Sequence, residues 1–242
     1  MNNLSYEIKQ SLLNKKASLI GFADIENLPR NVRHSLNYAI SIAVALNPHI
    51  IAKINASPTR EYYLEYQRAN DLLSYLGKFT ADVLTDNGYK AIPMEPTSDS
   101  INQKTLSTAL PHKTVATRGG LGWIGKSALL ITEEYGAAIR LNTVLTDAEL
   151  ETAVPIEVSH CNECMICSNS CPSRVHTPKN WNVNMKREDF YDAFACKKTL
   201  RNFEEKIGIG ICGICIAVCP WTKNTLQEKA ALNNIFRSMK EY

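Results

Sequence analysis

The sequence predicts a mixed α/β protein (α/β or α+β), in which a layered domain is followed by a cysteine-rich segment. Apolar residues recur at helix and strand spacing in the order helix, strand, strand, long helix, strand, which is typical of helices packed on a sheet. All eight cysteines fall between Cys161 and Cys219. We therefore expect two domains, residues 1–150 and residues 151–242.

Five segments carry the pattern of the first domain. Residues 4–16 read as an amphipathic helix, and the apolar residues that follow, 18–25, as a short buried strand. Residues 38–46 are apolar and β-branched and are expected to form a central strand. Residues 59–87 have leucines at helical spacing and end at Asn-Gly, which predicts a long helix. Residues 89–94 are expected to form a strand that ends at its proline.

The remaining elements are less regular. Residues 95–110 are a polar connection, and residues 138–145 read as another strand. Residues 186–206 are expected to form a charged helix that carries Cys196, and residues 224–239 a closing helix. Packing of the long helix on the sheet, rather than stacking on a cofactor, is the simpler interpretation of three of its tyrosines: Tyr62, Tyr63 and Tyr66.

The cysteines form two related motifs. The first reads C-x2-C-x2-C-x3-C followed by Pro172, and the second repeats its latter half before Pro220. In bacterial ferredoxins, three closely spaced thiolates of this run hold one 4Fe–4S cluster and the fourth reaches the other cluster. The spacing therefore predicts two 4Fe–4S clusters. The first would be held by Cys161, Cys164, Cys167 and Cys219, and the second by Cys171, Cys196, Cys212 and Cys215.

Two other uses of these cysteines explain the cysteine pattern less well. A disulfide framework requires an oxidising compartment and is usual in small secreted domains. A zinc site that joins the pairs Cys161/Cys164 and Cys212/Cys215 has suitable spacing but leaves four cysteines of the same motifs unused.

Composition argues against several classes of protein. The hydrophobic share of 45% and the charged share of 21% are ordinary for a globular protein. The net charge of +3 is too small to indicate nucleic acid or membrane as a partner. The first residues lack the apolar core of a signal peptide, and the longest apolar run, 38–46, is too short to span a bilayer. Because the predicted clusters are sensitive to oxygen and no export signal is seen, we expect a cytoplasmic protein.

A glycine-rich stretch precedes the cysteines. Residues 120–127 spell GLGWIGKS, which satisfies both G-x-x-x-x-G-K-S and G-x-G-x-x-G. Phosphate binding by either pattern requires a strand before the loop and a helix after it. Here the approach is helix-like and the exit is short and strand-like. The alternatives are a turn that lets backbone approach backbone, or one that approaches a large flat cofactor beside Trp123.

Together, RGGLGWIGKSALLIT, the following strand, CxxCxxCxxxCP and CGICxxxCPW resemble the epoxyqueuosine reductase family. Members of that family depend on cobalamin, carry two 4Fe–4S clusters and are related to reductive dehalogenases. The resemblance implies a nitroreductase-like, cobalamin-binding first domain, a ferredoxin-like second domain and the cluster ligands given above. For such a reductase we expect cofactor contacts from Lys113, Arg118, Gly120, Leu121, Gly122, Trp123, Gly125, Lys126 and Ser127. A solvated surface charge is the alternative for Lys113, Arg118 and Lys126.

One departure from the family concerns its proton donor. The family has an aspartate some fourteen residues before the glycine that matches Gly120, and this position is Leu106 here. The stretch TLSTALPHKT around it contains no acid, and its first titratable group is His112. We take His112 as the candidate catalytic acid, with ligation of cobalt or capping of a helix as alternatives. This departure, and the lack of the helical-repeat extension that some members carry, make tRNA a less expected substrate.

Three hypotheses of function follow. The first is an oxidoreductase in which electrons pass through two clusters to cobalt and then to an electrophilic substrate. The second is an electron-transfer or corrinoid-reducing partner protein without a substrate of its own. The third is a nucleotide-driven reductase that uses GxxxxGKS. For the first we expect a low-potential electron donor of the ferredoxin or flavodoxin type, a small molecule or a corrinoid protein as substrate, and no membrane.

Overall fold

A four-stranded antiparallel sheet organises the protein. The computed structural model describes residues 3–97 and 101–224. The strands lie in the order β1-β2-β6-β3, and each neighbouring pair is antiparallel. Their bounds are Leu19–Asp24 for β1, Tyr38–Ala45 for β2, Ala91–Pro93 for β3 and Ile139–Thr146 for β6. The predicted strands are therefore confirmed, and the expected central strand does lie inside the sheet.

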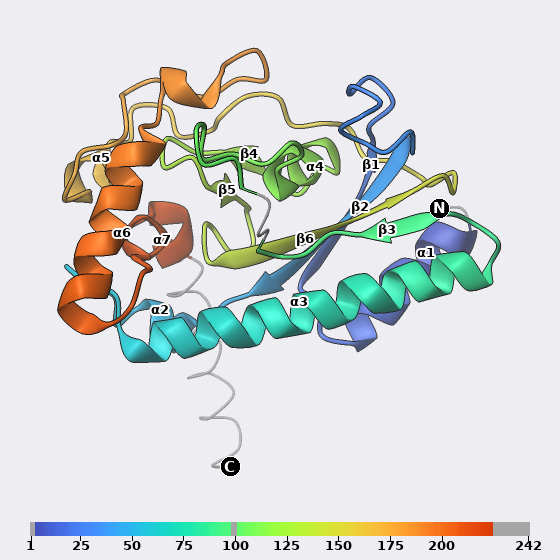
Figure 1. Cartoon of the computed structure of the whole chain (residues 1–242), viewed down its shortest axis with the longest axis horizontal. Helices are drawn as coiled ribbons and strands as arrows, with labels where there is room; N and C mark the ends of the chain where they lie inside the picture. Colours follow the sequence, from blue (N-terminus) through green and yellow to red (C-terminus); the bar gives the residue numbers. More distant parts are fainter. Residues whose placement is uncertain (1–2, 98–100, 225–242) are drawn as a thin grey trace, which may run out of the picture.

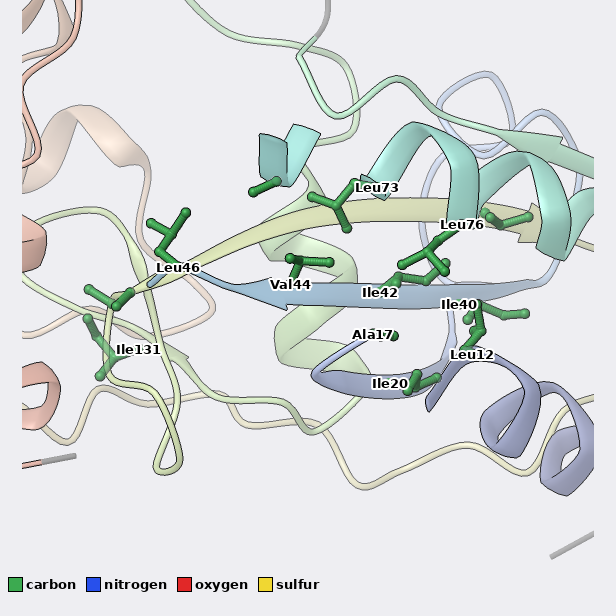
Figure 2. Close-up of a cluster of buried hydrophobic side chains, with 14 of the residues drawn as sticks. Leu12, Ala17, Ile20, Ile40, Ile42, Val44, Leu46, Leu73, Leu76 and Ile131 are labelled. Carbon is green, nitrogen blue, oxygen red and sulfur yellow. The ribbon is translucent and has the colours of Figure 1, made fainter. Parts of the chain in front are cut away.

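Helices cover both faces of this sheet (Figure 1). Helix α3 (Arg60–Asp86) runs along one face, with α1 (Asn3–Asn14) beside it, and the short helix α4 (His112–Arg118) packs on the other face. The alternation of side chains along β2 explains why helices pack on both faces. Ile40, Ile42 and Val44 pack with side chains of α1 and α3 (Figure 2). The small alanines of β2 lie in the clusters that contain residues of α4. A strand buried on both faces is expected to read as a continuous apolar run.

Helix α4 approaches β1 closely because both contacting residues are glycines. A Cβ added at Gly21 would overlap the carbonyl oxygen of Gly119, which follows the last residue of α4. The carbonyl of Gly119 therefore occupies the space that a side chain would take. This contact positions α4 and the glycine-rich stretch after it.

The long helix begins and ends as expected. The side chain of Thr59 accepts a hydrogen bond from the amide of Tyr62, and Gly88, with φ of 85°, follows the last turn. The short helix α2 (Pro48–Ile51) precedes it and begins with the Asn-Pro pair after β2.

The second half of the chain has little regular structure. A two-stranded sheet joins β4 (Trp123–Ile124) to β5 (Leu130–Ile131). Three helices follow, which carry the cysteines together with their connecting loops: α5 (Ile166–Ser170), α6 (Ala193–Ile207) and α7 (Ile214–Ala217). They gather at one end of the molecule (Figure 1).

One predicted helix is shorter than expected. The helix predicted over residues 186–206 begins only at Ala193, because Asp192 caps it by accepting hydrogen bonds from the amides of Phe194 and Ala195. A separate 3-10 turn, η1 (Arg187–Asp189), precedes it. Cys196 still lies on the helix. The closing helix predicted over residues 224–239 lies almost wholly outside the described residues.

The two expected domains share a core. Ile214, Ile216 and Ala217 of α7 belong to the same cluster of buried side chains as Leu73 and Leu76 of α3. No helix among the described residues is long and apolar enough to cross a membrane.

Candidate functional site

The fold brings the eight cysteines into two neighbouring groups. In the first, Cys167 lies close enough to Cys161, Cys219 and Cys164 to interact with them electrostatically, and Cys219 does the same with Cys161. We call these four the first thiol set. Cys219 follows Cys161 by almost sixty residues, so this set exists only because α7 packs beside the first motif.

The other four cysteines form the second thiol set. Cys212 interacts electrostatically with Cys196 and Cys171, and Cys215 with all three of them. Cys215 also interacts with Cys167 and, with four thiols of the first set, lines a small cavity of about 80 Å³. The two sets are therefore adjacent. They have the same members as the two ligand groups predicted from spacing.

The thiols are partly buried, and burial makes five of them harder to ionise in the protein alone: Cys167, Cys196, Cys212, Cys215 and Cys219. Burial, reinforced by the neighbouring Cys161 and Cys219, raises the pKa of Cys167 to about 11. Burial likewise raises the pKa of Cys196, Cys212 and Cys219 above the usual value for a thiol. Among residues 3–97 and 101–224, no three His, Cys, Asp or Glu side chains come together closely enough to hold a single metal ion.

Lys126 is buried beside the first thiol set. Its side chain is 2% exposed and lines the small cavity. The ammonium group donates to the carbonyl oxygens of Asn162 at 2.6 Å and Cys164 at 3.1 Å. No carboxylate of the described residues lies within ion-pair distance of it. A buried ammonium without an anionic partner is costly, so a negative group beside it would be stabilising.

The rest of the glycine-rich stretch packs against the same region. A Cβ added at Gly125 would lie 3.4 Å from the sulfur of Cys161. Trp123 is 1% exposed, stacks on His160 at 4.5 Å and meets the edge of Trp221 at 4.9 Å between ring centroids. Its contact with a cofactor stays a prediction.

The structural context of a phosphate-binding loop is absent from this stretch. Helix α4 precedes it, and Ser127 is followed by a turn at Ala128 and by β5 rather than by a helix. Lys126, the residue that would reach phosphate, bonds to the cysteine loop instead. Both features agree with the expectation from sequence that the required context is missing.

Two larger cavities adjoin α4. The first, of about 550 Å³, is lined by Arg118, Lys113 and Leu106 among others, and we call it the Arg118 cavity. The second, of about 590 Å³, includes His112, Lys113 and Arg140, and we call it the Arg140 cavity. The two share the wall formed by Pro111 and Lys113. Each is of the size that binds small molecules or parts of a cofactor.

Lys113 lies at this shared wall, and His112 beside it lines the Arg140 cavity. The two ring nitrogens of His112 are 2.9 Å from the hydroxyl of Thr143 and 2.9 Å from the carbonyl oxygen of Glu95. His112 thus links two chain segments and does not cap α4. Burial, aided by the positive charge of Arg140, lowers its pKa, although the bond to Glu95 acts in the opposite direction.

Lys113 donates to the carbonyl oxygen of Ala128 at 2.7 Å, and burial is the main reason that its pKa falls to about 8. Arg118 lines the Arg118 cavity, and its guanidinium lies 3.4 Å from the carbonyl oxygen of Asp24. The remaining predicted cofactor contacts, Gly120, Leu121, Gly122, Trp123 and Gly125, line neither cavity, and Ser127 lines the small thiol cavity.

The structure reveals functional candidates that the sequence interpretation missed. Arg140 lies over the ring of Tyr66 at 4.3 Å and donates to its hydroxyl at 3.2 Å. Burial raises the pKa of Tyr66, but Arg140 and hydrogen bonds with Thr97 and Asn70 outweigh it, so the net pKa is lowered. Tyr66 and Arg140 both line the Arg140 cavity. Helical spacing could not distinguish this tyrosine from those that only pack.

Leu106, which we expect at the position of the family aspartate, lines the Arg118 cavity. Its backbone is left-handed, with φ of 51°, and its carbonyl oxygen accepts a hydrogen bond from Arg187 at 2.6 Å. Arg187 therefore attaches this loop to the region that precedes α6.

No family model matches the chain. Among curated proteins, it is similar to the epoxyqueuosine reductase of Lactococcus garvieae (strain Lg2), with 32% identity over 117 residues, 48% of this chain and 33% of that protein. It is 29% identical over 149 residues to the tetrachloroethene reductive dehalogenase of Sulfurospirillum multivorans, 57% of this chain and 27% of that protein. The matches thus span well under half of these relatives.

Solved structures show the fold. A crystal structure of epoxyqueuosine reductase with a tRNA-Tyr stem loop superposes with a TM-score of 0.63 and 19% identity, over 92% of this chain and 66% of that chain. A catabolic reductive dehalogenase in complex with 3-bromo-4-hydroxybenzoic acid gives 0.64 and 17% identity, over 85% and 30%. The chain therefore has the mixed α/β fold shared by these two groups of reductases.

Proposed function

We propose that this chain is an iron–sulfur, corrinoid-dependent reductase resembling epoxyqueuosine reductase. The observation that carries the proposal is the meeting of eight cysteines as two adjacent sets of four, next to the glycine-rich stretch. The similarity to epoxyqueuosine reductases and a reductive dehalogenase supports it.

The residues fit two 4Fe–4S clusters. Each set contains four thiols, which is the ligand number that such a cluster requires. Bound iron would ionise thiols whose pKa is otherwise raised by burial, because the metal supplies the missing positive charge. Lys126 would in turn gain an anionic neighbour, since a cluster held by four thiolates is negatively charged overall.

The fit of the two larger cavities to a corrinoid is less specific than the fit of the thiol sets to two clusters. Their combined space and their apolar walls are suited to a large flat ring with amide side chains, whereas the glycines of the stretch pack against other parts of the chain. Lys113 and Arg118 would donate hydrogen bonds to its amide or phosphate oxygens. A bound corrinoid would supply a strongly reducing centre able to transfer electrons to an electrophilic carbon.

The chain's own groups would bind the substrate and supply its proton. His112 is our candidate acid at the wall of the Arg140 cavity, and Tyr66 is another titratable group of that cavity. The Nε2–H group of His112 donates a hydrogen bond to the carbonyl oxygen of Glu95, and this hydrogen bond would have to break before the proton could reach a substrate. Arg140 would attract an anionic substrate or stabilise negative charge that develops on it.

We propose a ferredoxin or flavodoxin as electron donor in the cytoplasm, and a small electrophile or a corrinoid protein as substrate. One structural neighbour was solved with a modified tRNA stem loop, so the same screen should include that RNA. Because we expect Leu106 at the position of the family aspartate, this RNA is the less expected substrate.

The test is the metal content of protein purified without oxygen and incubated with cobalamin. We expect about eight iron and eight sulfide per chain, as two cubane clusters require, together with about one cobalt. Iron and sulfide without cobalt would leave the electron-transfer protein as the function. Zinc without sulfide would contradict the proposal altogether. ATP binding that is lost in Lys126→Ala would instead support the nucleotide-driven reductase.

A further inference from the structure

Two aromatic side chains beside the second thiol set have no part in the function proposed above. His176 and Tyr191 form an isolated antiparallel bridge, and their rings stack with centroids 5.6 Å apart. His176 is 8% exposed. Neither residue belongs to a cysteine motif, so the stack is brought to the thiols by the loops between α5 and α6.

Each of the two side chains is hydrogen-bonded to a thiol. The Nε2 atom of His176 lies 3.3 Å from the sulfur of Cys215, and the hydroxyl of Tyr191 bonds to the sulfur of Cys196. Cys215 and Cys196 are both members of the second thiol set. The bridge thus supplies one hydrogen-bonding group to each of two ligands of the same predicted cluster.

The direction of the histidine bond follows from its other nitrogen. The Nδ1 atom is buried and has no hydrogen-bond partner among the described residues. A buried N–H without a partner is rarer than a buried acceptor without one, so the proton belongs on Nε2. His176 therefore donates toward the sulfur of Cys215, and the hydroxyl of Tyr191 can donate in the same way to a thiolate at Cys196.

Both thiol sets have local backbone donors, and in the second set the amide of Ile214 donates to Cys212. Cys219 receives hydrogen bonds from the backbone amides of Trp221 and Thr222. These donors lie within three residues of the ligand and follow from the local turn. His176 lies 39 residues before Cys215, and Tyr191 bonds to Cys196 of the same set, so the bridge serves the second set and not the first.

We propose that His176 and Tyr191 are positioning residues that donate hydrogen bonds to the thiolates of Cys215 and Cys196 and thereby raise the reduction potential of the second cluster relative to the first. This rests on the proposed function, because it requires both clusters. Reduction adds negative charge that is shared with the thiolate sulfurs. Donors to those sulfurs stabilise the reduced form more than the oxidised form.

The experiment is a potentiometric titration with dithionite, followed by electron paramagnetic resonance, on the complete cluster-loaded protein. Tyr191→Phe keeps the ring stack and removes only the hydroxyl. His176→Leu removes the donor, and His176→Gln keeps a donor of similar reach. The signal that is missing from Cys196→Ala identifies the second cluster, so each potential can be assigned.

We expect Tyr191→Phe and His176→Leu each to lower the potential of the second cluster and to leave the first unchanged. At a fixed applied potential, the ratio of reduced to oxidised second cluster should fall about tenfold, which for one electron corresponds to about 59 mV. His176→Gln should restore most of the wild-type value. If His176→Leu loses the cluster, Tyr191→Phe alone decides.

Unchanged potentials in variants that retain eight iron would overturn this inference and leave the proposed function intact. Equal shifts of both clusters would also overturn it, because they would indicate a general change of packing. Wild-type protein without iron and sulfide would instead overturn the proposed function, and this inference with it.

Discussion

The ammonium nitrogen of Lys126 lies 2.6 Å from the carbonyl oxygen of Asn162, inside the loop that carries Cys161 and Cys164. This bond joins the glycine-rich stretch to the first cysteine motif, which are separated by more than thirty residues. The lysine of a stretch that matches a nucleotide-binding pattern is thus used to hold a cysteine loop.

Lys126→Met should weaken the first cluster specifically. The variant keeps the length of the side chain but loses the charge and the bonds to the loop. Bonds from a charged donor contribute about 2 kcal/mol, a factor of roughly 30 in an equilibrium constant. We expect faster release of half of the iron to a chelator, measured by absorbance. Lys78→Met, at an exposed position of α3, is the control. Equal release from both variants would contradict this role.

Cys196→Ala should remove one cluster and leave the other. Cys196 interacts with Cys171 and Cys212 of the second thiol set but belongs to no tight cysteine motif. We expect iron to fall from about eight to about four per chain, because a cubane cluster needs all of its ligands. Iron and sulfide analysis measures this, and Cys164→Ala is the matched variant for the first set. Loss of all the iron, or of none, would refute the assignment.

His112→Gln should change how stability depends on pH. Burial and Arg140 lower the pKa of His112 in the folded protein, so the unfolded chain binds a proton more readily as the pH falls through about 6.5. Wild-type protein should therefore lose unfolding free energy on acidification, and the variant should lose less. Urea unfolding at pH values of about 7.5 and 5 checks this. His49→Gln, at an exposed position, is the control. Identical pH dependence in wild type and His112→Gln would show that His112 is not held neutral.

Gly21→Ala should destabilise the packing of α4 on β1. The added methyl group would overlap the carbonyl oxygen of Gly119, which is backbone and cannot rotate away. We expect a loss of about 2–3 kcal/mol, typical of overpacking, and weaker binding of any ligand in the cavities that adjoin α4. Gly210→Ala, whose Cβ would meet Glu204 at 3.4 Å, is the control. A variant as stable as wild type would show that the strand and the helix can separate without cost.

Most elements of the first domain could be predicted because their signals are local. Apolar spacing located α1 and α3, and the continuous apolar run of β2 is the pattern of a strand buried on both faces. The start of α6 was misplaced because the preceding charged residues also suit a helix. Only the cap at Asp192 marks where the helix begins.

The candidate site was predictable only where its chemistry depends on spacing. The grouping of Cys161, Cys164 and Cys167 follows from a short motif. The pairing of Tyr66 with Arg140, and of His176 with Tyr191, joins residues far apart in the chain and leaves no periodic pattern.

By itself, the sequence determined the mixed α/β class, the order of the elements and the cysteine spacing that predicts two clusters, because each depends on residues within a few turns of one another. Only the tertiary structure decided what surrounds them. It placed the side chain of Lys126 against the cysteine loop and His112 between Glu95 and Thr143. It also placed a histidine and a tyrosine beside the second thiol set. Those contacts form where the chain returns to itself, and they are set by packing of the whole core.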